Sequence, residues 1–204
     1  MHLSISTMKV ILTGFGKFYN ILENPSTYLV QTLRDDPHVT ETRVIETAAV
    51  AVKQELAPLW DHARASGEPT LFFHLGVDDS AEEVHFEECA YNLADFCIPD
   101  EAGWEPQEEI IFEGEPDVIH TSLPVAKLVE EVGLGCTTST DPGHYVCNYT
   151  YFHSLVHTKS HANQFVLFVH VPPFEVLPME DQLVIIRKLL GLLVPRLRAE
   201  TASP

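Results

Sequence analysis

The run QFVLFVHV, residues 164–171, is the feature that most limits the possible folds of this chain. Its apolar residues fill both alternating faces, whereas a strand with one face in water alternates apolar with polar residues. Such a run is typical of a central strand in a parallel sheet that helices cover on both sides. We therefore expect an α/β protein.

Shorter apolar runs and helix-patterned segments alternate along the rest of the chain, as a mostly parallel sheet requires. Strands are predicted at residues 9–13, 42–46, 70–75, 84–90, 136–140 and 164–171. Helices are predicted after Asn24, over 50–65, between Pro124 and Gly133, over 145–157 and over 179–193. The predicted architecture is a three-layer α/β/α domain with a twisted sheet between two helical layers.

Proline, glycine and asparagine residues predict several helix ends. Asn24 suits an N-cap, and Pro25 suits the first position of a helix. Pro195 is expected to end the last helix, because a proline inside a helix removes a hydrogen bond. Residues 98–119, rich in proline, glycine and acidic side chains, are expected to form a long loop with a short hairpin.

Length and charge limit the classes of protein and partner. The 204 residues fit one domain, predicted at 8–204, after a loose tail at 1–7. The formal net charge of −18 argues against nucleic acid as a partner, because phosphate binding needs a cationic face. No apolar run reaches 18 residues, so no membrane span or membrane partner is predicted, and we expect a soluble cytoplasmic protein.

The chain has four cysteines, and Cys147 is the one with a context that suggests chemistry. No CxxC pair is present, so we expect neither a zinc ribbon nor a redox motif, and we interpret all four as reduced thiols. Cys147 lies in GHYVCNYTY, between a glycine turn and a predicted helix start. The positive end of a helix favours a thiolate. The alternative is a buried cysteine that only packs.

Two further residues could complete a catalytic group with that thiol. His170 lies near the carboxyl end of the predicted central strand, where open α/β sheets bind ligands. It could act as the base that activates the thiol, or it could be a buried histidine with a structural role. Glu87, in VHFEECAYN, could orient that histidine, or it could be one more exposed acid.

Weaker signals have alternative interpretations. The sequence GFG after the first strand lacks the third glycine of a dinucleotide-binding loop. His153, His157 and His161 follow a helical spacing that could hold a metal, although a solvated helix face is the simpler interpretation. Phe15 and Phe18 flank a turn after the first strand, and they could belong to the core or enclose a flat apolar ligand.

The order of these residues resembles the pyroglutamyl-peptidase I family, cysteine peptidases that remove N-terminal pyroglutamate. The similarity extends from Met8 to about Leu193. FVHVPP and PDEAGW are more similar to the eukaryotic branch than to the bacterial one. The blocks that carry the resemblance, in the family's order, are TGFGKFYNILENPS, HLGV, EECAYNLADFCIPDE, DPGHYVCNYTYFHSL and FVHVPPF.

This resemblance implies a cysteine omega-peptidase that needs no metal or other cofactor and acts on pyroglutamyl peptides. It implies Cys147 as the nucleophile, His170 as general base and then acid, and Glu87 as the residue that orients His170. It further implies that Phe15 and Phe18 enclose the lactam ring. The other substrate-binding residues that it implies are Asn24, Val77 and Val146.

Several positions depart from the family pattern. Glu88, Cys97 and His144 stand where many members have arginine, and Pro142 stands where they have alanine. Lost cations near a thiolate raise its pKa, and a proline removes one backbone N–H. The alternative function is therefore a family member with little or no activity that binds pyroglutamyl groups. Since relatives include monomers and tetramers, the oligomeric state stays open.

Overall fold

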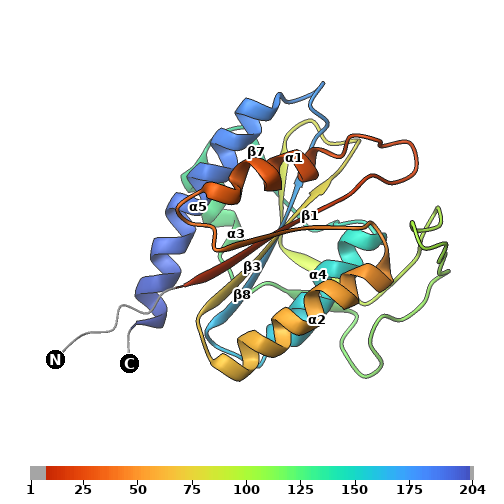
Figure 1. Cartoon of the computed structure of the whole chain (residues 1–204), viewed down its shortest axis with the longest axis horizontal. Helices are drawn as coiled ribbons and strands as arrows, with labels where there is room; N and C mark the ends of the chain where they lie inside the picture. The colour runs from red at the N-terminus through yellow and green to blue at the C-terminus, as the bar shows by residue number, and fades with distance from the viewer. Residues whose placement is uncertain (1–7, 203–204) are drawn as a thin grey trace.

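The computed structural model describes residues 8–202, so the predicted tail at 1–7 lies outside the described residues. Strands and helices alternate through most of the chain (Figure 1). The elements are β1 (Lys9–Phe15), α1 (Pro25–Thr32), η1 (Leu33–Asp35), β2 (Glu41–Ile45), α2 (Ala49–Ser66), β3 (Thr70–Val77), β4 (Val84–Glu87), β5 (Cys89–Tyr91), β6 (Val118–His120), α3 (Val125–Val132), β7 (Cys136–Ser139), α4 (Val146–Thr158), β8 (Gln164–Val171) and α5 (Met179–Thr201).

The central sheet has the strand order β2-β1-β3-β8-β4-β7. Its neighbours are parallel except for β4 and β8, which pair antiparallel at His85–His170 and Phe86–Val169. Every residue of β8 is buried, as predicted for a central strand covered on both faces. The predicted mostly parallel α/β architecture is therefore confirmed.

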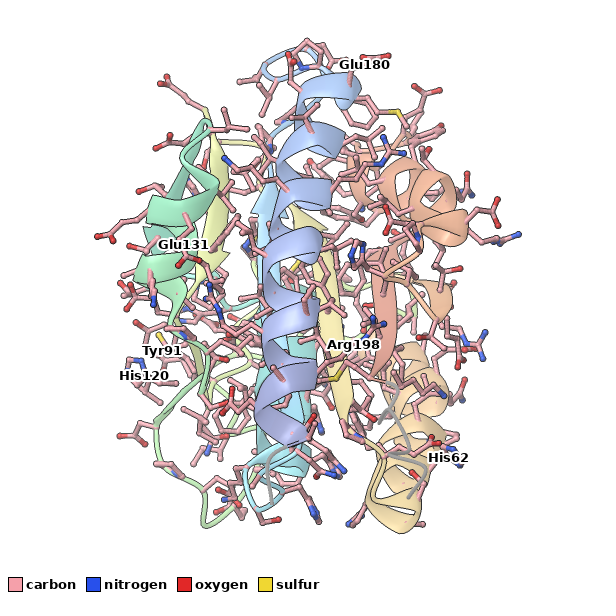
Figure 2. All side chains as sticks on the ribbon, turned by 90° about the vertical axis from the view of Figure 1, so that its left-hand side faces the viewer. His62, Tyr91, His120, Glu131, Glu180 and Arg198 are labelled. Atoms are coloured by element: carbon pink, nitrogen blue, oxygen red, sulfur yellow. The ribbon has the colours of Figure 1, made fainter. Side chains whose placement is uncertain are left out.

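Helices cover both faces of this sheet (Figure 1). Helices α1, α3 and α5 pack on one face, and α2 and α4 pack on the other. Figure 2 shows α5 crossing its face lengthwise, with Glu180 near one end and Arg198 near the other. No helix among residues 8–202 is long and apolar enough to cross a membrane.

Alternation along β8 decides which residues face α4. Leu167 and Val169 belong to the core under α5, whereas Val166 and Phe168 belong to the core under α2 and α4. Because side chains alternate along a strand, His170 shares the face of Phe168. Its ring centroid lies 4.7 Å from that of Phe168, so the histidine faces the helix that carries Cys147.

The helix that begins after Asn24 forms as predicted. The Asn24 side chain accepts a hydrogen bond from the Ser26 N–H, and Pro25 takes the first helical position. The helix predicted between Pro124 and Gly133 also forms, and Gly133 ends it in the left-handed conformation.

The prediction that Pro195 ends the last helix is wrong. Helix α5 continues to Thr201, because Leu197, beyond the proline, still packs into the core. Core burial after the proline therefore outweighs its local cost.

Two strand predictions are also corrected. The strand predicted over 84–90 divides at Glu88, whose N–H bonds to Ser139 while its carbonyl accepts from Thr121. The chain thereby passes from the main sheet into a separate antiparallel ribbon of β5 and β6. Residues 98–119 form no hairpin among themselves, and the bridge there joins Glu109 to Ala94 outside the segment. Both differences depend on long-range partners.

Candidate active site

Three elements bring the predicted catalytic residues to one edge of the sheet. Glu87 ends β4, His170 is the penultimate residue of β8, and Cys147 is the second residue of α4. The antiparallel pairing of His85 with His170 and of Phe86 with Val169 sets Glu87 beside β8, level with Phe168. The fold thus brings together residues that are up to 83 positions apart in the chain.

Glu87 and His170 form a buried pair. His170 Nδ1 lies 2.7 Å from Glu87 Oε1, with exposed fractions of 5% for the histidine and 0% for the glutamate. Burial lowers the pKa of His170, but its hydrogen bonds with Cys147 and Glu87 outweigh burial and raise that pKa to about 10. The ring therefore carries a positive charge at neutral pH, and it holds that charge beside the Cys147 thiol.

The position of the thiol depends on the start of α4. Tyr145 caps this helix with extended backbone, and its side chain makes no capping hydrogen bond in the structure as described. First-turn N–H groups of a helix have no partner within the helix, so those near Cys147 point outward as donors. The helix dipole adds partial positive charge at the same place. Such a place can stabilise a thiolate or an oxyanion.

A cavity of about 490 Å³ opens over this group. Cys147 and His170 line it together with apolar and acidic side chains from four loops. The ring of Phe18 packs against Tyr145 with centroids 5.7 Å apart, and burial raises the pKa of Tyr145, so its phenol is neutral. Other lining residues include Ile21, Val77, Asp78, Asp79, Cys97 and Asp141.

Comparison with known proteins identifies the family. Residues 8–200 match the model of the pyroglutamyl peptidase family. The chain belongs to that family. It is 31% identical to pyroglutamyl-peptidase 1 of Rattus norvegicus over 201 residues, which cover 90% of each chain. It is 29% identical to the pyrrolidone-carboxylate peptidase of Thermosipho africanus, over 81% of this chain and 82% of the relative.

Solved structures share the fold of this pyroglutamyl peptidase family member. The pyrrolidone carboxyl peptidase from Thermococcus litoralis superposes with a TM-score of 0.81 at 24% identity, covering 94% of this chain and 96% of that chain. The pyrrolidone carboxyl peptidase from Thermus thermophilus superposes with a TM-score of 0.76 at 26% identity, covering 90% of this chain and all of that chain.

The substrate-binding residues implied by the family resemblance divide into two groups. Phe18 and Val77 line the cavity, whereas Phe15, Asn24 and Val146 do not. Phe15 has an exposed fraction of 1% and stacks on Phe168 beneath the site. Asn24 donates to the Gly16 carbonyl and caps α1, so it supports the loop that carries Phe18. The buried Val146 begins α4.

Sequence reasoning missed Tyr145 as the ring that faces Phe18. The sequence could have indicated this role, because Tyr145 lies only two residues before Cys147, at the turn into the helix. It also missed Gly76, which is the register partner of His170 across β3 and β8. Nothing in the sequence of a strand predicts that a side chain from a distant helix will lie against its glycine.

Two of the four positions that depart from the family pattern line the cavity, whereas Glu88 and His144 do not. Pro142 and Cys97 line it directly, and Cys97 is exposed. Pro142 belongs to a turn in which Gly143 has a φ of 70° and donates its N–H to Asp141 Oδ1 at 3.1 Å. The His144 ring packs edge-on against Tyr91, away from the thiol. The turn before Cys147 is therefore held by local hydrogen bonding and not by a cation.

The histidines on α4 pack against another helix. The rings of His153 and His157 stack on Trp60 of α2, with centroids 6.0 Å and 4.3 Å away. Burial lowers the pKa of His153 to about 3. The expected solvated face is therefore wrong, since a tryptophan covers it. No group of three possible metal ligands occurs among the described residues.

Proposed function

We propose that this chain hydrolyses the bond between an N-terminal pyroglutamyl residue and the next residue of a peptide. Cys147 is the nucleophile in this proposal, His170 is the general acid and base, and Glu87 orients His170. The observation that carries it is the 2.7 Å contact of His170 with Glu87 beneath the Cys147 thiol. Membership in the pyroglutamyl peptidase family supports the same assignment.

The proposed reaction has two chemical stages. The Cys147 thiolate attacks the pyroglutamyl carbonyl, and first-turn N–H groups of α4 stabilise the oxyanion. His170 then gives its proton to the leaving amine, and a thioester remains on Cys147. A water molecule loses a proton to His170 and attacks the thioester, which releases pyroglutamate and restores the thiol.

Glu87 acts through the imidazole in this scheme. Its carboxylate accepts from Nδ1 and stabilises the positive ring that pairs with the thiolate. The Tyr151 hydroxyl donates to the Glu87 carbonyl at 2.9 Å, which fixes the end of β4 against α4. The backbone of Glu87 is therefore held by α4, and its Oε1 atom contacts His170 of β8.

Apolar rings suit the proposed substrate group. Pyroglutamate has no free ammonium, so its lactam needs an uncharged surface and not a carboxylate partner. Phe18, Tyr145 and Val77 provide such a surface in the cavity that also contains Cys147. We assign the lactam to that side of the cavity. Phe15 does not line the cavity and packs on Phe168 in the core instead.

The proposal includes a reducing, cytoplasmic setting, because the nucleophile must stay a free thiol. Support comes from the four cysteines, all of which are unpaired. Two of them, Cys97 and Cys147, line the same cavity. Incubation with oxidised glutathione is expected to remove activity, and dithiothreitol is expected to restore it.

Hydrolysis of a pyroglutamyl-linked fluorogenic amine tests the proposal. Turnover is expected in the parent and should be lost in Cys147→Ala. Cys136→Ala is the matched control, because Cys136 lies on the edge strand β7 and does not line the cavity. A folded parent that binds pyroglutamate without turnover would support the binding-module alternative instead. Activity that survives in Cys147→Ala would refute the assignment of the nucleophile.

A further inference from the structure

The cavity has a charge distribution that the proposed reaction does not use. Asp78, Asp79 and Asp141 line it, whereas no lysine or arginine among residues 8–202 does. Asp78 and Asp79 follow β3 directly, and Asp141 lies in the turn that leads to Cys147. Carboxylates from two different segments of the chain therefore line the same cavity as the reacting thiol.

Local hydrogen bonds hold two of these carboxylates in place. Asp78 Oδ1 accepts from the Ser80 N–H at 3.0 Å and from the Ser80 hydroxyl at 2.7 Å. Asp141 Oδ1 accepts from the Gly143 N–H at 3.1 Å. Neither carboxylate forms an ion pair with a lysine or arginine in the described part of the chain. Both residues therefore line the cavity as carboxylates that no lysine or arginine neutralises.

Asp78 also keeps its charge despite partial burial. Burial raises its pKa, but hydrogen bonds from Ser80 and the charges of His170 and His85 outweigh burial and lower that pKa overall. The His85 Nδ1 atom lies 3.7 Å from Asp78 Oδ2. Asp79 is exposed. A carboxylate at the surface of a cavity still attracts a cationic group of a substrate.

In the proposed reaction, the part of the cavity that Asp78, Asp79 and Asp141 line is free to bind the peptide beyond pyroglutamate. One lactam ring occupies only part of about 490 Å³, and the apolar surface of Phe18, Val77 and Tyr145 suits that ring. We propose that the remaining part selects peptides with lysine or arginine after pyroglutamate and disfavours aspartate or glutamate there. This inference rests on the proposed function and specifies its substrate class.

Three peptides that differ in one residue test this selectivity. They carry pyroglutamate followed by Lys, Gln or Glu, with the same neutral amide beyond, and kcat/KM is measured for each. The Lys peptide is expected to exceed the Glu peptide by about 30-fold at low salt, with Gln between them. Raising the salt to about 0.5 M should reduce this ratio several-fold, because exposed charges are screened.

Variants assign the selectivity to the cavity. Asp79→Asn is expected to reduce the Lys-to-Glu ratio about threefold, and the double variant Asp78→Asn/Asp79→Asn about tenfold. Asp35→Asn is the matched control for Asp79→Asn, because it makes the same change in net charge at an exposed position of η1 outside the cavity. An equal loss of selectivity in Asp35→Asn would overturn the inference, since total charge would then explain the preference.

The outcomes separate this inference from the proposed function. Hydrolysis of all three peptides at similar kcat/KM would refute the charge selectivity and leave the peptidase proposal standing. If none is hydrolysed, the peptidase proposal fails. Binding of the three peptides to Cys147→Ala, measured by calorimetry, then still tests selectivity. Tighter binding of the Lys peptide would support it, and equal or absent binding would overturn it.

Discussion

The sulfur of Cys147 lies against the backbone of Gly76, so close that a methyl group at position 76 would stand 2.9 Å from Sγ. The same methyl would stand 2.8 Å from Cζ of Phe168. Gly76 is also the register partner of His170. The absence of a side chain at this strand position therefore lets the thiol of α4 lie against the sheet, beside the imidazole.

Gly76→Ala is expected to displace the thiol and reduce kcat by about 100-fold, because small errors in position cost large factors in rate. The overpacked core should also lose about 1–3 kcal/mol of unfolding free energy. Hydrolysis assays and urea denaturation measure the two effects. In the Cys147→Ala background, Gly76→Ala should destabilise less, because the collision with sulfur is gone. An equal loss in both backgrounds would contradict the contact.

Glu87→Gln tests the support of the imidazole. The substitution keeps the shape of the side chain but removes its charge, so the His170 pKa should fall from about 10 and kcat should drop by about 10²- to 10⁴-fold. The pH profile of Cys147 alkylation by iodoacetamide reports the thiolate that pairs with this ring, so it should change in the variant. Glu88→Gln is the matched neighbour and should leave that profile unchanged. Identical profiles for the parent and Glu87→Gln would refute the claim that Glu87 raises the pKa of His170.

Buried neutral histidines predict a loss of stability in acid. Burial lowers the pKa of His74 to about 3, and its ring nitrogens lie 2.7 Å from Thr13 Oγ1 and 2.9 Å from Ser154 Oγ. The unfolded chain binds a proton at this histidine below pH about 6.5, whereas the folded chain does not. Stability should therefore fall between pH about 6.5 and 3, by up to about 1.4 kcal/mol per pH unit for this residue.

Denaturant titrations across that range check the prediction. In His74→Gln, which keeps a hydrogen-bonding side chain, the unfolding free energy should depend less steeply on pH. His62→Gln, on the exposed face of α2, is the control and should keep the parent slope. A parent whose unfolding free energy is constant from pH 6.5 to 4 would show that His74 is protonated in the folded state.

His170 predicts the opposite trend in alkali. Its folded pKa of about 10 exceeds the unfolded value, so its contribution to stability is complete below pH about 6.5 and is lost as pH rises toward 10. Unfolding free energies measured from pH 7 to 10 should decline in the parent. The decline should be smaller in Glu87→Gln, where the proton is held less tightly. An equal decline in both would contradict this origin.

Two glycines with open surroundings predict opposite effects of the same substitution. Gly191 lies inside α5, where alanine should stabilise the fold by about 0.5–1 kcal/mol. Gly67 ends α2 with a φ of 66°, where alanine should destabilise it by about 1–2 kcal/mol. Thermal unfolding of both variants measures the contrast. If the melting temperatures of both variants shift in the same direction, side-chain contacts and not backbone conformation determine the effect of alanine at these positions.

Elements with strong local patterns could be predicted from the sequence. QFVLFVHV predicted the buried central strand, and Asn24 with Pro25 predicted where α1 begins. These signals are local, because strand alternation and helix capping depend on residues within a few positions. The family motifs likewise indicated Glu87, Cys147 and His170, which the fold brings to one edge of the sheet.

Features that depend on contacts between distant parts of the chain could be seen only in the tertiary structure. Helix α5 passes Pro195 because the residues beyond it reach the core, and Trp60 covers the histidine face of α4. Phe15, which was expected to enclose the lactam with Phe18, packs on Phe168 in the core, and the ring that faces Phe18 is Tyr145. Packing free energy comes from contacts between residues that are far apart in the chain, and local sequence patterns do not predict such contacts. The approach of Cys147 to Gly76 is of that kind.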